Sequence, residues 1–188
     1  MKAALCAAVV VAALAALPVL AAEKEPRCGD ASSDPASAVK VCTRLIEAGG
    51  LERPALANAY DSRGAAWASE GQHDRAIADF TKAIELDPNL SAAYVNRALS
   101  RSEKGESDMA IADYDAALEL SPNDARAHAG RAFEWSMKGE YKRAIANYDD
   151  LIRLEPRAQR GYFGRGRMRF YAGDFSGAAA SRERCGRC

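Results

Sequence analysis

The chain has 188 residues, with 26 basic and 26 acidic side chains that cancel to a net charge of zero, and only two histidines. His73 and His128 are not spaced as metal ligands, so we expect both to be structural residues and expect no metal or cofactor. No serine or cysteine stands in a nucleophile context, and no glycine-rich phosphate loop follows a predicted strand. The sequence therefore predicts no catalytic residues.

The first segment, residues 1–22, carries one basic residue, then an uncharged stretch rich in Ala, Leu and Val, and ends before the charged Glu23. This pattern is typical of a secretory signal peptide, and we expect cleavage after Ala21 or Ala22. The alternative is an uncleaved membrane anchor, because the stretch is about long enough to span a bilayer. No later segment could cross a membrane, so we expect no membrane contact after cleavage.

Four cysteines remain after residue 22, and an oxidising compartment would favour disulfides among them. We expect Cys28 and Cys42 to pair, closing a loop of about 15 residues that is worth on the order of 3 kcal/mol. The alternative is two isolated thiols. Cys185 and Cys188 form a CxxC motif in an all-helical context that provides no thioredoxin-like scaffold, and two cysteines are too few for zinc. We predict neither redox nor metal chemistry there, and the pairing of these two stays open.

Three similar phrases, AIADFTKAIELDP, AIADYDAALELSP and AIANYDDLIRLEP, recur at an interval of thirty-four residues. Each follows a helical segment of its own, and apolar and small residues in both segments recur at helical spacing. A glycine marks the turn between the two predicted helices of each unit, and a proline ends the second helix. The units are residues 57–90, 91–124 and 125–158, followed by a fourth, incomplete unit over residues 159–188.

These units resemble the tetratricopeptide repeat. Counted from the first residue of each unit, position 8 is small, position 20 is Ala, position 32 is Pro, and position 24 is aromatic in three units, as Phe80, Tyr114 and Tyr148. The resemblance implies an all-α fold, a right-handed α-α superhelix (a solenoid) of 34-residue helix-turn-helix repeats. Within the N-terminal segment 23–56, residues 34–50 would form a half-repeat capping helix, with Asp34 as its N-cap.

Position 7 is arginine in every unit, although the family more often has leucine there. These arginines are Arg63, Arg97, Arg131 and Arg165. Position 23 on the second helix is Asp79, Asp113, Asn147 and Ser181. We expect the first two arginines to pair with the aspartates of their own units, while Arg131 and Arg165 have weaker partners and are freer to find others. The alternative is an arginine ladder that binds an anionic ligand.

The resemblance also implies a concave groove, lined by the first helix of each unit, that binds a protein or peptide segment. Its expected lining changes from small and mildly polar to apolar, aromatic and basic toward the C-terminus. The residues expected to contact a partner are Asn58, Asp61, Val95, Leu99, Arg126, Phe133, Met137, Arg160, Phe163 and Arg167. We predict a non-enzymatic adaptor or assembly scaffold. Short exported proteins of this family resemble those of Gram-negative bacteria, so we expect a periplasmic or secreted location.

The last unit departs from the repeat after Ala178, because Arg182 replaces the aromatic residue at position 24. Either a truncation or frame shift near Ser181 or a natural degenerate end would explain this, and we expect a short, frayed last helix in both cases. The apolar surface left uncovered would aggregate, self-associate or be completed by a partner. From Arg157 onward, the sequence contains eight arginines and two acidic residues. The alternative function is therefore binding of an anionic polymer or nucleic acid at this end, although an exported groove with few lysines favours a peptide and no nucleic acid.

Overall fold

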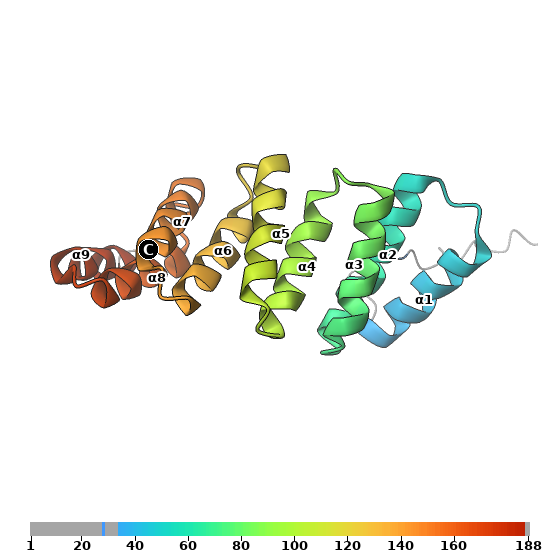
Figure 1. Ribbon diagram of the computed structural model, residues 1–188, viewed down its shortest axis with the longest axis horizontal. Coiled ribbons are helices and arrows are strands. Elements are labelled where there is room, and N and C mark those ends of the chain that lie inside the picture. The colour runs from blue at the N-terminus through green and yellow to red at the C-terminus, as the bar shows by residue number, and fades with distance from the viewer. Residues whose placement is uncertain (1–27, 29–33, 187–188) are drawn as a thin grey trace, which may run out of the picture.

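A computed structural model describes Cys28 and residues 34–186, and the predicted signal segment lies outside this part. The described residues form helices and no strand, which confirms the predicted all-α fold. The helices are α1 (Pro35–Ala48), α2 (Arg53–Ser69), α3 (His73–Leu86), α4 (Ser91–Glu103), α5 (Ser107–Leu120), α6 (Ala125–Met137), α7 (Tyr141–Leu154), α8 (Gln159–Tyr171) and α9 (Phe175–Cys185). They follow one another along the long axis of the molecule (Figure 1).

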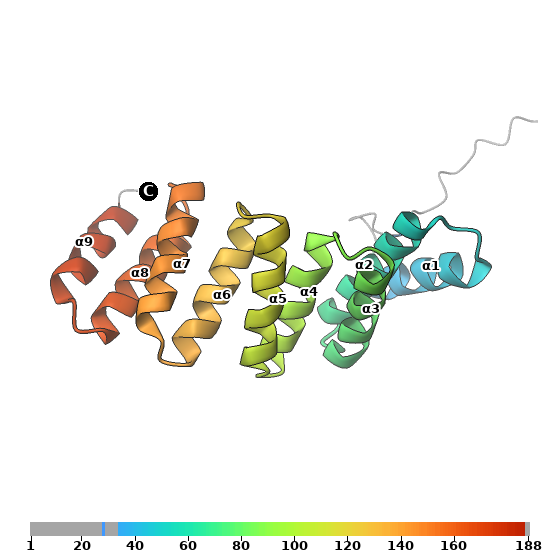
Figure 2. The same cartoon turned by 45° about the horizontal axis from the view of Figure 1, so that its top comes forward.

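Each thirty-four-residue unit is a pair of packed helices, α2 with α3, α4 with α5, α6 with α7 and α8 with α9. Figure 2 shows these pairs stacked as an extended array in which α1 lies at the N-terminal end. Because each helix contacts mainly its neighbours in the chain, the array is a solenoid whose buried residues lie at the junctions between successive helices. Among the described helices, none combines the length and the apolar character needed to cross a bilayer.

The turns between helices depend on the residues that mark them in the sequence. Gly71, Gly105, Gly139 and Gly173 all have φ between 72° and 82°, a left-handed conformation that residues with a side chain avoid. The second helices end at Leu86, Leu120 and Leu154, each two residues before the proline that cannot continue the helix. At the start of α1, the Asp34 carboxylate accepts a hydrogen bond from the Ser37 backbone N–H at 3.0 Å, as expected of an N-cap.

The core consists of small residues at the helix crossings and one aromatic ring per junction. Ala76, Ala110 and Ala144, at position 20 of successive units, are fully buried. Phe80, Tyr114 and Tyr148 at position 24 are 1%, 1% and 7% exposed. Small side chains let the helices approach closely, and the rings fill the space that remains toward the adjoining helix.

A glycine lies beneath each of these rings. A Cβ atom on Gly64 would lie 2.7 Å from the Phe80 ring, inside van der Waals contact. The Tyr114 ring lies equally tightly on Gly130 of the next unit, and Tyr148 on Gly164. The ring therefore packs on its own unit when the glycine is at position 8, and on the next unit when the glycine is at position 6.

At the N-terminal end, α1 is held beside residue 28. The Cα atoms of Cys28 and Cys42 are 4.8 Å apart and their sulfur atoms lie within bonding distance, so the structure brings the two predicted partners together. Cys42 is the fully buried residue of α1. The covalent bond in the folded protein remains a prediction, and its test is given in the Discussion.

Candidate functional site

The first helices of the units lie side by side, since α2 contacts α4 and α4 contacts α6. They form the face on which the sequence predicted a binding groove. Asn58, Arg126, Arg160 and Arg167 are exposed on these helices, and Asp61 is half-buried. Leu99, Phe133, Met137 and Phe163 are 45%, 43%, 66% and 64% exposed. These predicted residues are accessible to a partner, whereas their contact with one stays a prediction.

Val95 is an exception, and its assignment to the groove was wrong. It is fully buried in a cluster with Ala98, Tyr114 and Ala127. The reason is the close approach of α4 to α6, which covers position 5 of the unit at residues 91–124. Val95 therefore stabilises the junction between units and cannot touch a ligand.

A polar pair crosses the groove between the first two units. The Asn96 side chain donates a hydrogen bond of 3.0 Å to Oδ1 of Asp61. Burial raises the pKa of the Asp61 carboxyl above its usual value, while the Asn96 hydrogen bond and the positive charge of Arg126 act in the opposite direction. The positive charge of Arg126, another predicted groove residue, thus acts on the Asp61 carboxyl from the first helix of the third unit.

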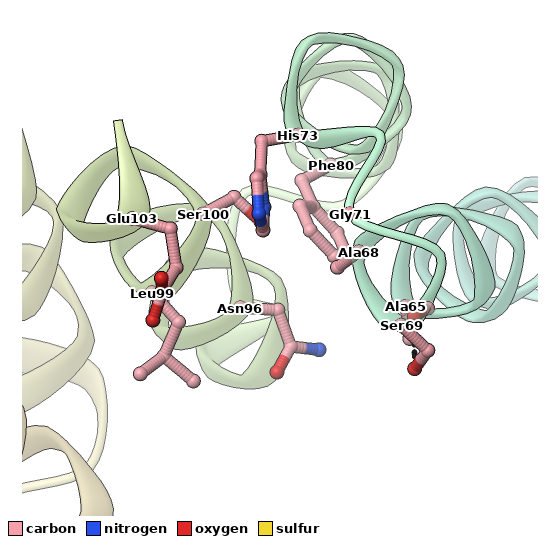
Figure 3. A pocket seen from close by; sticks show the side chains of 10 residues that line it. All are labelled: Ala65, Ala68, Ser69, Gly71, His73, Phe80, Asn96, Leu99, Ser100 and Glu103. Atoms are coloured by element: carbon pink, nitrogen blue, oxygen red, sulfur yellow. Dashed lines mark hydrogen bonds between the residues drawn. The ribbon is translucent and has the colours of Figure 1, made fainter.

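A pocket of about 560 Å³, here called the N-terminal pocket, lies between the α2–α3 turn and α4. It has room because Ala65 and Ala68 contribute only methyl groups, and Leu99 stands at its edge. Figure 3 shows the His73 ring reaching toward Ser100 across the upper part of the pocket. Neither Nδ1 of His73 nor Oγ of Ser100 has a hydrogen-bond partner among the described residues. His73 was expected to be a satisfied structural residue, and the free nitrogen departs from that expectation.

The other histidine is only partly satisfied, because Nδ1 of His128 also has no hydrogen-bond partner among the described residues. His128 is 6% exposed, and its Nε2–H donates a hydrogen bond of 3.0 Å to the backbone carbonyl oxygen of Pro122. It holds the loop before α6 against that helix. Within the described residues no cluster of three or more His, Cys, Asp or Glu side chains could hold a metal ion.

Sequence reasoning missed a buried acid at the centre of the groove face. Glu134 is 1% exposed, and the hydroxyl of Ser102 donates a short hydrogen bond to its carboxylate across the α4–α6 junction. The negative charge of Glu134, added to the larger effect of burial, raises the pKa of Tyr114. The only sequence signal was an acidic residue at position 10, where other units carry Ala66, Ser100 and Met168. The pair links α4 to α6.

The arginines at position 7 occupy the seam between helices. Arg63 donates two hydrogen bonds to the Asp79 carboxylate at 2.7 and 2.8 Å, and Arg97 donates two to Asp113 at 3.0 and 2.7 Å. This confirms both predicted pairs, which are bidentate and largely buried. Each arginine also donates to a threonine of the preceding unit, Arg63 to Thr43 and Arg97 to Thr81.

Arg131 and Arg165 have the weaker partners that were predicted within their own units, and each finds another partner, a carboxylate of the preceding unit. Arg131 donates to Asn147 of its own unit and to the Asp115 carboxylate of the preceding unit at 2.5 Å. Arg165 donates to Ser181 at 3.3 Å and to Asp149 of the preceding unit at 2.6 Å. Asp115 and Asp149 are at position 25, where the earlier units have the threonines. Each arginine thus keeps one carboxylate, taken either from its own unit or from the unit before.

The C-terminal end of the groove face is apolar and basic. A hollow of about 860 Å³, here called the C-terminal hollow, lies over α8 and α9 and is lined among others by Phe163, Gly166, Arg167, Phe170, Phe175 and Arg182. The Phe170 ring makes edge-to-face contacts with Tyr171 and Phe175, with ring centroids 5.9 and 5.4 Å apart. This is the surface that the sequence predicted to be uncovered. The helix α9 has 11 residues against 14 in α3, α5 and α7, so it is short as predicted.

Cys185 is a free, half-buried thiol at the edge of the same hollow, and it lies 3.8 Å from the backbone carbonyl oxygen of Gln159. Its partner in the CxxC motif, Cys188, lies outside the described residues. The prediction that the motif is chemically inert therefore stays a prediction.

Comparison with known proteins shows which sequences and structures share this pattern. Family profiles described as tetratricopeptide repeat match residues 56–90, 80–112 and 138–183. No curated protein matches the sequence. The similar solved structures described below share less than 25% sequence identity with this chain, so their similarity establishes the fold alone.

A crystal structure of MamA superposes with a TM-score of 0.74 at 20% identity and covers 81% of this chain and 86% of its own. MamA residues 41 to the end from Desulfovibrio magneticus RS-1 give 0.73 at 19%, covering 80% and 83%. YrrB, described as a protein with an unusual peptide-binding site, gives 0.68 at 15%, covering 80% and 76%. The agreement over four fifths of the chain supports the α-α solenoid as a whole.

Proposed function

This chain belongs to the tetratricopeptide repeat family, and we propose that it is a non-enzymatic interaction module that binds a peptide segment of another protein along its groove face. Proteins of this family act as scaffolds for protein–protein contacts, and the similar YrrB is described as having a peptide-binding site. The proposed role is that of an adaptor or assembly scaffold, in which no residue performs chemistry.

The observation that carries the proposal is the row of accessible apolar side chains on α4 and α6 beside charged ones. Leu99, Phe133 and Met137 are each more than two-fifths exposed. Arg126 lies on the same face and is exposed. Exposed apolar side chains of this kind favour a binding surface, and an aromatic ring near an arginine is the combination found at binding hot spots. The N-terminal pocket would receive one small or polar side chain of the bound segment.

The experiment is affinity capture with the mature chain from an extract of the compartment in which it resides, followed by binding measurements on the recovered partner. Replacing Phe133 or Arg126 by Ala should weaken binding of that partner about 10-fold or more, because truncating a hot-spot side chain costs at least about 2 kcal/mol.

Matched controls come from the second helices. Met109 on α5 is 52% exposed, and the side chain of Arg153 on α7 is exposed to a similar extent. Both lie on second helices, away from the groove face, so the variants Met109→Ala and Arg153→Ala should bind the partner as the wild-type chain does. Equal loss in the groove and control variants, or no loss in either, would refute the groove assignment.

Binding of an anionic polymer or nucleic acid through the arginine-rich end has less support. Three of its arginines lie beside carboxylates, since Arg160 pairs with Glu155, Arg165 with Asp149 and Arg169 with Asp174. These three ion pairs reduce the positive charge that this end could offer to phosphates. A steep fall of DNA affinity with rising salt would favour the polymer, and weak, shallow salt dependence would favour the peptide.

Export is part of the proposal, with the signal peptide predicted over residues 1–22. The support is the sequence pattern of that segment together with the close approach of Cys28 and Cys42. Cell fractionation and N-terminal sequencing of the mature protein test it, and the expected first residue is Ala22 or Glu23.

A further inference from the structure

The C-terminal hollow has a gap at the place where another unit of this chain holds an aromatic ring. In the unit at residues 57–90, Gly64 at position 8 lies under the ring of Phe80 at position 24. The unit at residues 159–188 also has glycine at position 8, Gly166. Its position 24 is Arg182, which is exposed. The nearest neighbours of a Cβ on Gly166 would be Ser181 Cβ at 3.2 Å and the Ala178 backbone oxygen at 3.5 Å, so no ring covers this glycine.

The surroundings of this gap are strongly apolar. Phe163, Phe170 and Phe175 are 64%, 57% and 64% exposed around a hollow of about 860 Å³. Single exposed apolar side chains are ordinary, but several aromatic rings gathered at one depression mark an interaction site. A ligand that covered them would remove apolar surface from water and place a side chain over Gly166.

The positive charge at the hollow favours an acidic partner over a second copy of this chain. Arg167 and Arg182 both line it, and neither forms an ion pair with any residue in the described part of the chain. From Arg157 to Cys188 the sequence has eight arginines and two acidic residues. A two-fold dimer through this face would set one arginine-rich surface against its copy, and like charges facing each other cost several kcal/mol. An acidic partner would instead pair with both free arginines.

The shape of the hollow suits a helix. It runs over the adjacent helices α8 and α9, and at the inner junctions the corresponding surface is covered by the first helix of the next unit, as α6 covers α5 and α8 covers α7. An amphipathic helix presents side chains at i, i+3, i+4 and i+7 to such a surface.

We propose that the C-terminal hollow binds an acidic amphipathic helix of a partner protein, which inserts a large aromatic or aliphatic side chain over Gly166 and pairs its carboxylates with Arg167 and Arg182. This inference builds on the proposed interaction role but adds a second binding site with its own ligand chemistry. The bound helix would complete the array as a further unit does.

The test uses a synthetic peptide of 13 residues, the length of α8, with Leu, Trp and Leu at positions i, i+4 and i+7 and glutamate at the flanking positions. Binding of the labelled peptide to the full mature chain is followed by fluorescence anisotropy. We expect a dissociation constant on the order of 10 μM, with the affinity at least about 10-fold weaker when lysine replaces every glutamate. Equal affinity for the acidic and the basic peptide would overturn the proposal.

The decisive variant is Arg182→Phe, which gives this unit the glycine and phenylalanine pair found at Gly64 and Phe80. The new ring would fill the hollow from within the chain, so peptide binding should fall at least about 10-fold while Tm rises by about 2–4 °C. Arg157→Phe makes the same exchange at an exposed residue that does not line the hollow, and it should leave both values unchanged. Phe175→Ala should weaken binding without stabilising the fold.

The outcomes separate this inference from the proposed function. Arg126→Ala should not affect the helical peptide, and loss of its binding in that variant would place it in the groove and refute the hollow as its site. Undiminished binding to Arg182→Phe would also refute it. If the wild-type chain forms a concentration-dependent dimer and Arg182→Phe abolishes it, the occupant of the hollow is a second copy of the chain, and the proposed partner helix is refuted. Failure of peptide binding with intact groove-dependent capture would overturn this inference alone.

Discussion

Glycines on the first helices have a packing role that differs from one unit to the next. Gly130 lies beneath the Tyr114 ring, which is 1% exposed and cannot move aside. Gly166 has no ring above it. The same residue type on two equivalent helices is therefore required in one case by direct overlap with a ring, whereas in the other a Cβ atom would meet Ser181 Cβ at 3.2 Å and the Ala178 backbone oxygen at 3.5 Å. This contrast gives a direct test of the packing described here.

Gly130→Ala should destabilise the protein and Gly166→Ala should not. Alanine improves helix propensity by about 1 kcal/mol at both sites, but at Gly130 its methyl group overlaps the Tyr114 ring, and overpacking costs about 1–3 kcal/mol. We expect a net loss of up to about 2 kcal/mol for Gly130→Ala, whereas at Gly166 the close Cβ contact of 3.2 Å with Ser181 offsets the gain in propensity and leaves a change within about 0.5 kcal/mol. Urea unfolding followed by circular dichroism measures both. A similar change for the two variants would contradict the ring contact as the cause.

At the scale of helices, the arginines of position 7 are held by carboxylates that come from two different places. Asp79 and Asp113 serve the arginines of their own units, and Asp115 and Asp149 serve those of the following units. Where position 23 loses its carboxylate, as in Asn147 and Ser181, position 25 of the preceding unit gains one. As a result, every arginine at position 7 has one carboxylate beside it. A buried guanidinium without a carboxylate would cost several kcal/mol.

Moving the carboxylate that binds Arg131 from position 25 of the preceding unit to position 23 of its own unit should leave the stability unchanged. Asp115→Thr alone leaves Arg131 with Asn147 only, and we expect a loss of about 1–2 kcal/mol, since Asp115 is half-exposed and Arg131 largely buried. The double variant Asp115→Thr, Asn147→Asp reproduces the arrangement of Thr81 and Asp113 around Arg97, and it should recover wild-type stability to within about 0.5 kcal/mol. Chemical denaturation of the four proteins of this cycle gives the coupling. Additive losses in the double variant would show that the two carboxylates are not equivalent.

Sequence alone predicted the helices, the glycine turns, the Arg63–Asp79 and Arg97–Asp113 pairs and the uncovered C-terminal face, because all of these depend on spacing within one unit. It failed where two units meet. The burial of Val95, the Ser102–Glu134 hydrogen bond and the use of Asp115 by Arg131 depend on how far one unit is rotated against the next, which spacing does not reveal. A comparison of positions 23 and 25 across the units, from Thr81 to Asp115, would have indicated the exchange.

For the molecule as a whole, stability is the sum of local terms, because each unit contacts only its neighbours. A change at one end should therefore be felt mainly at that end. The Cys28–Cys42 junction lies at the N-terminal end, where α1 packs on α2 and has no other helix to cover it among the described residues. The disulfide predicted there would fix the end of the array at which unfolding can start.

Reducing the protein, or replacing both cysteines by serine, should loosen α1 and α2 while leaving α6 to α9 as they are. The sequence separation of 14 corresponds to a stabilisation of about 3 kcal/mol in the chain-entropy view. Hydrogen exchange measured by mass spectrometry, with and without reductant, should show faster exchange confined to residues 34–69. A uniform increase along the chain would mean that the array unfolds as one cooperative unit.

The origin of each carboxylate also decides which units the chain could lose by recombination. Without residues 57–90, Arg97 would still have Asp113, and without residues 125–158, Arg165 would inherit Asp115 in place of Asp149. Without residues 91–124, Arg131 would follow Thr81 and face only Asn147 in its own unit, a cation with no acid beside it. We therefore expect the array to tolerate loss of the first or the third unit and to be destabilised by loss of the second. These three units are equal in length, but they are not interchangeable.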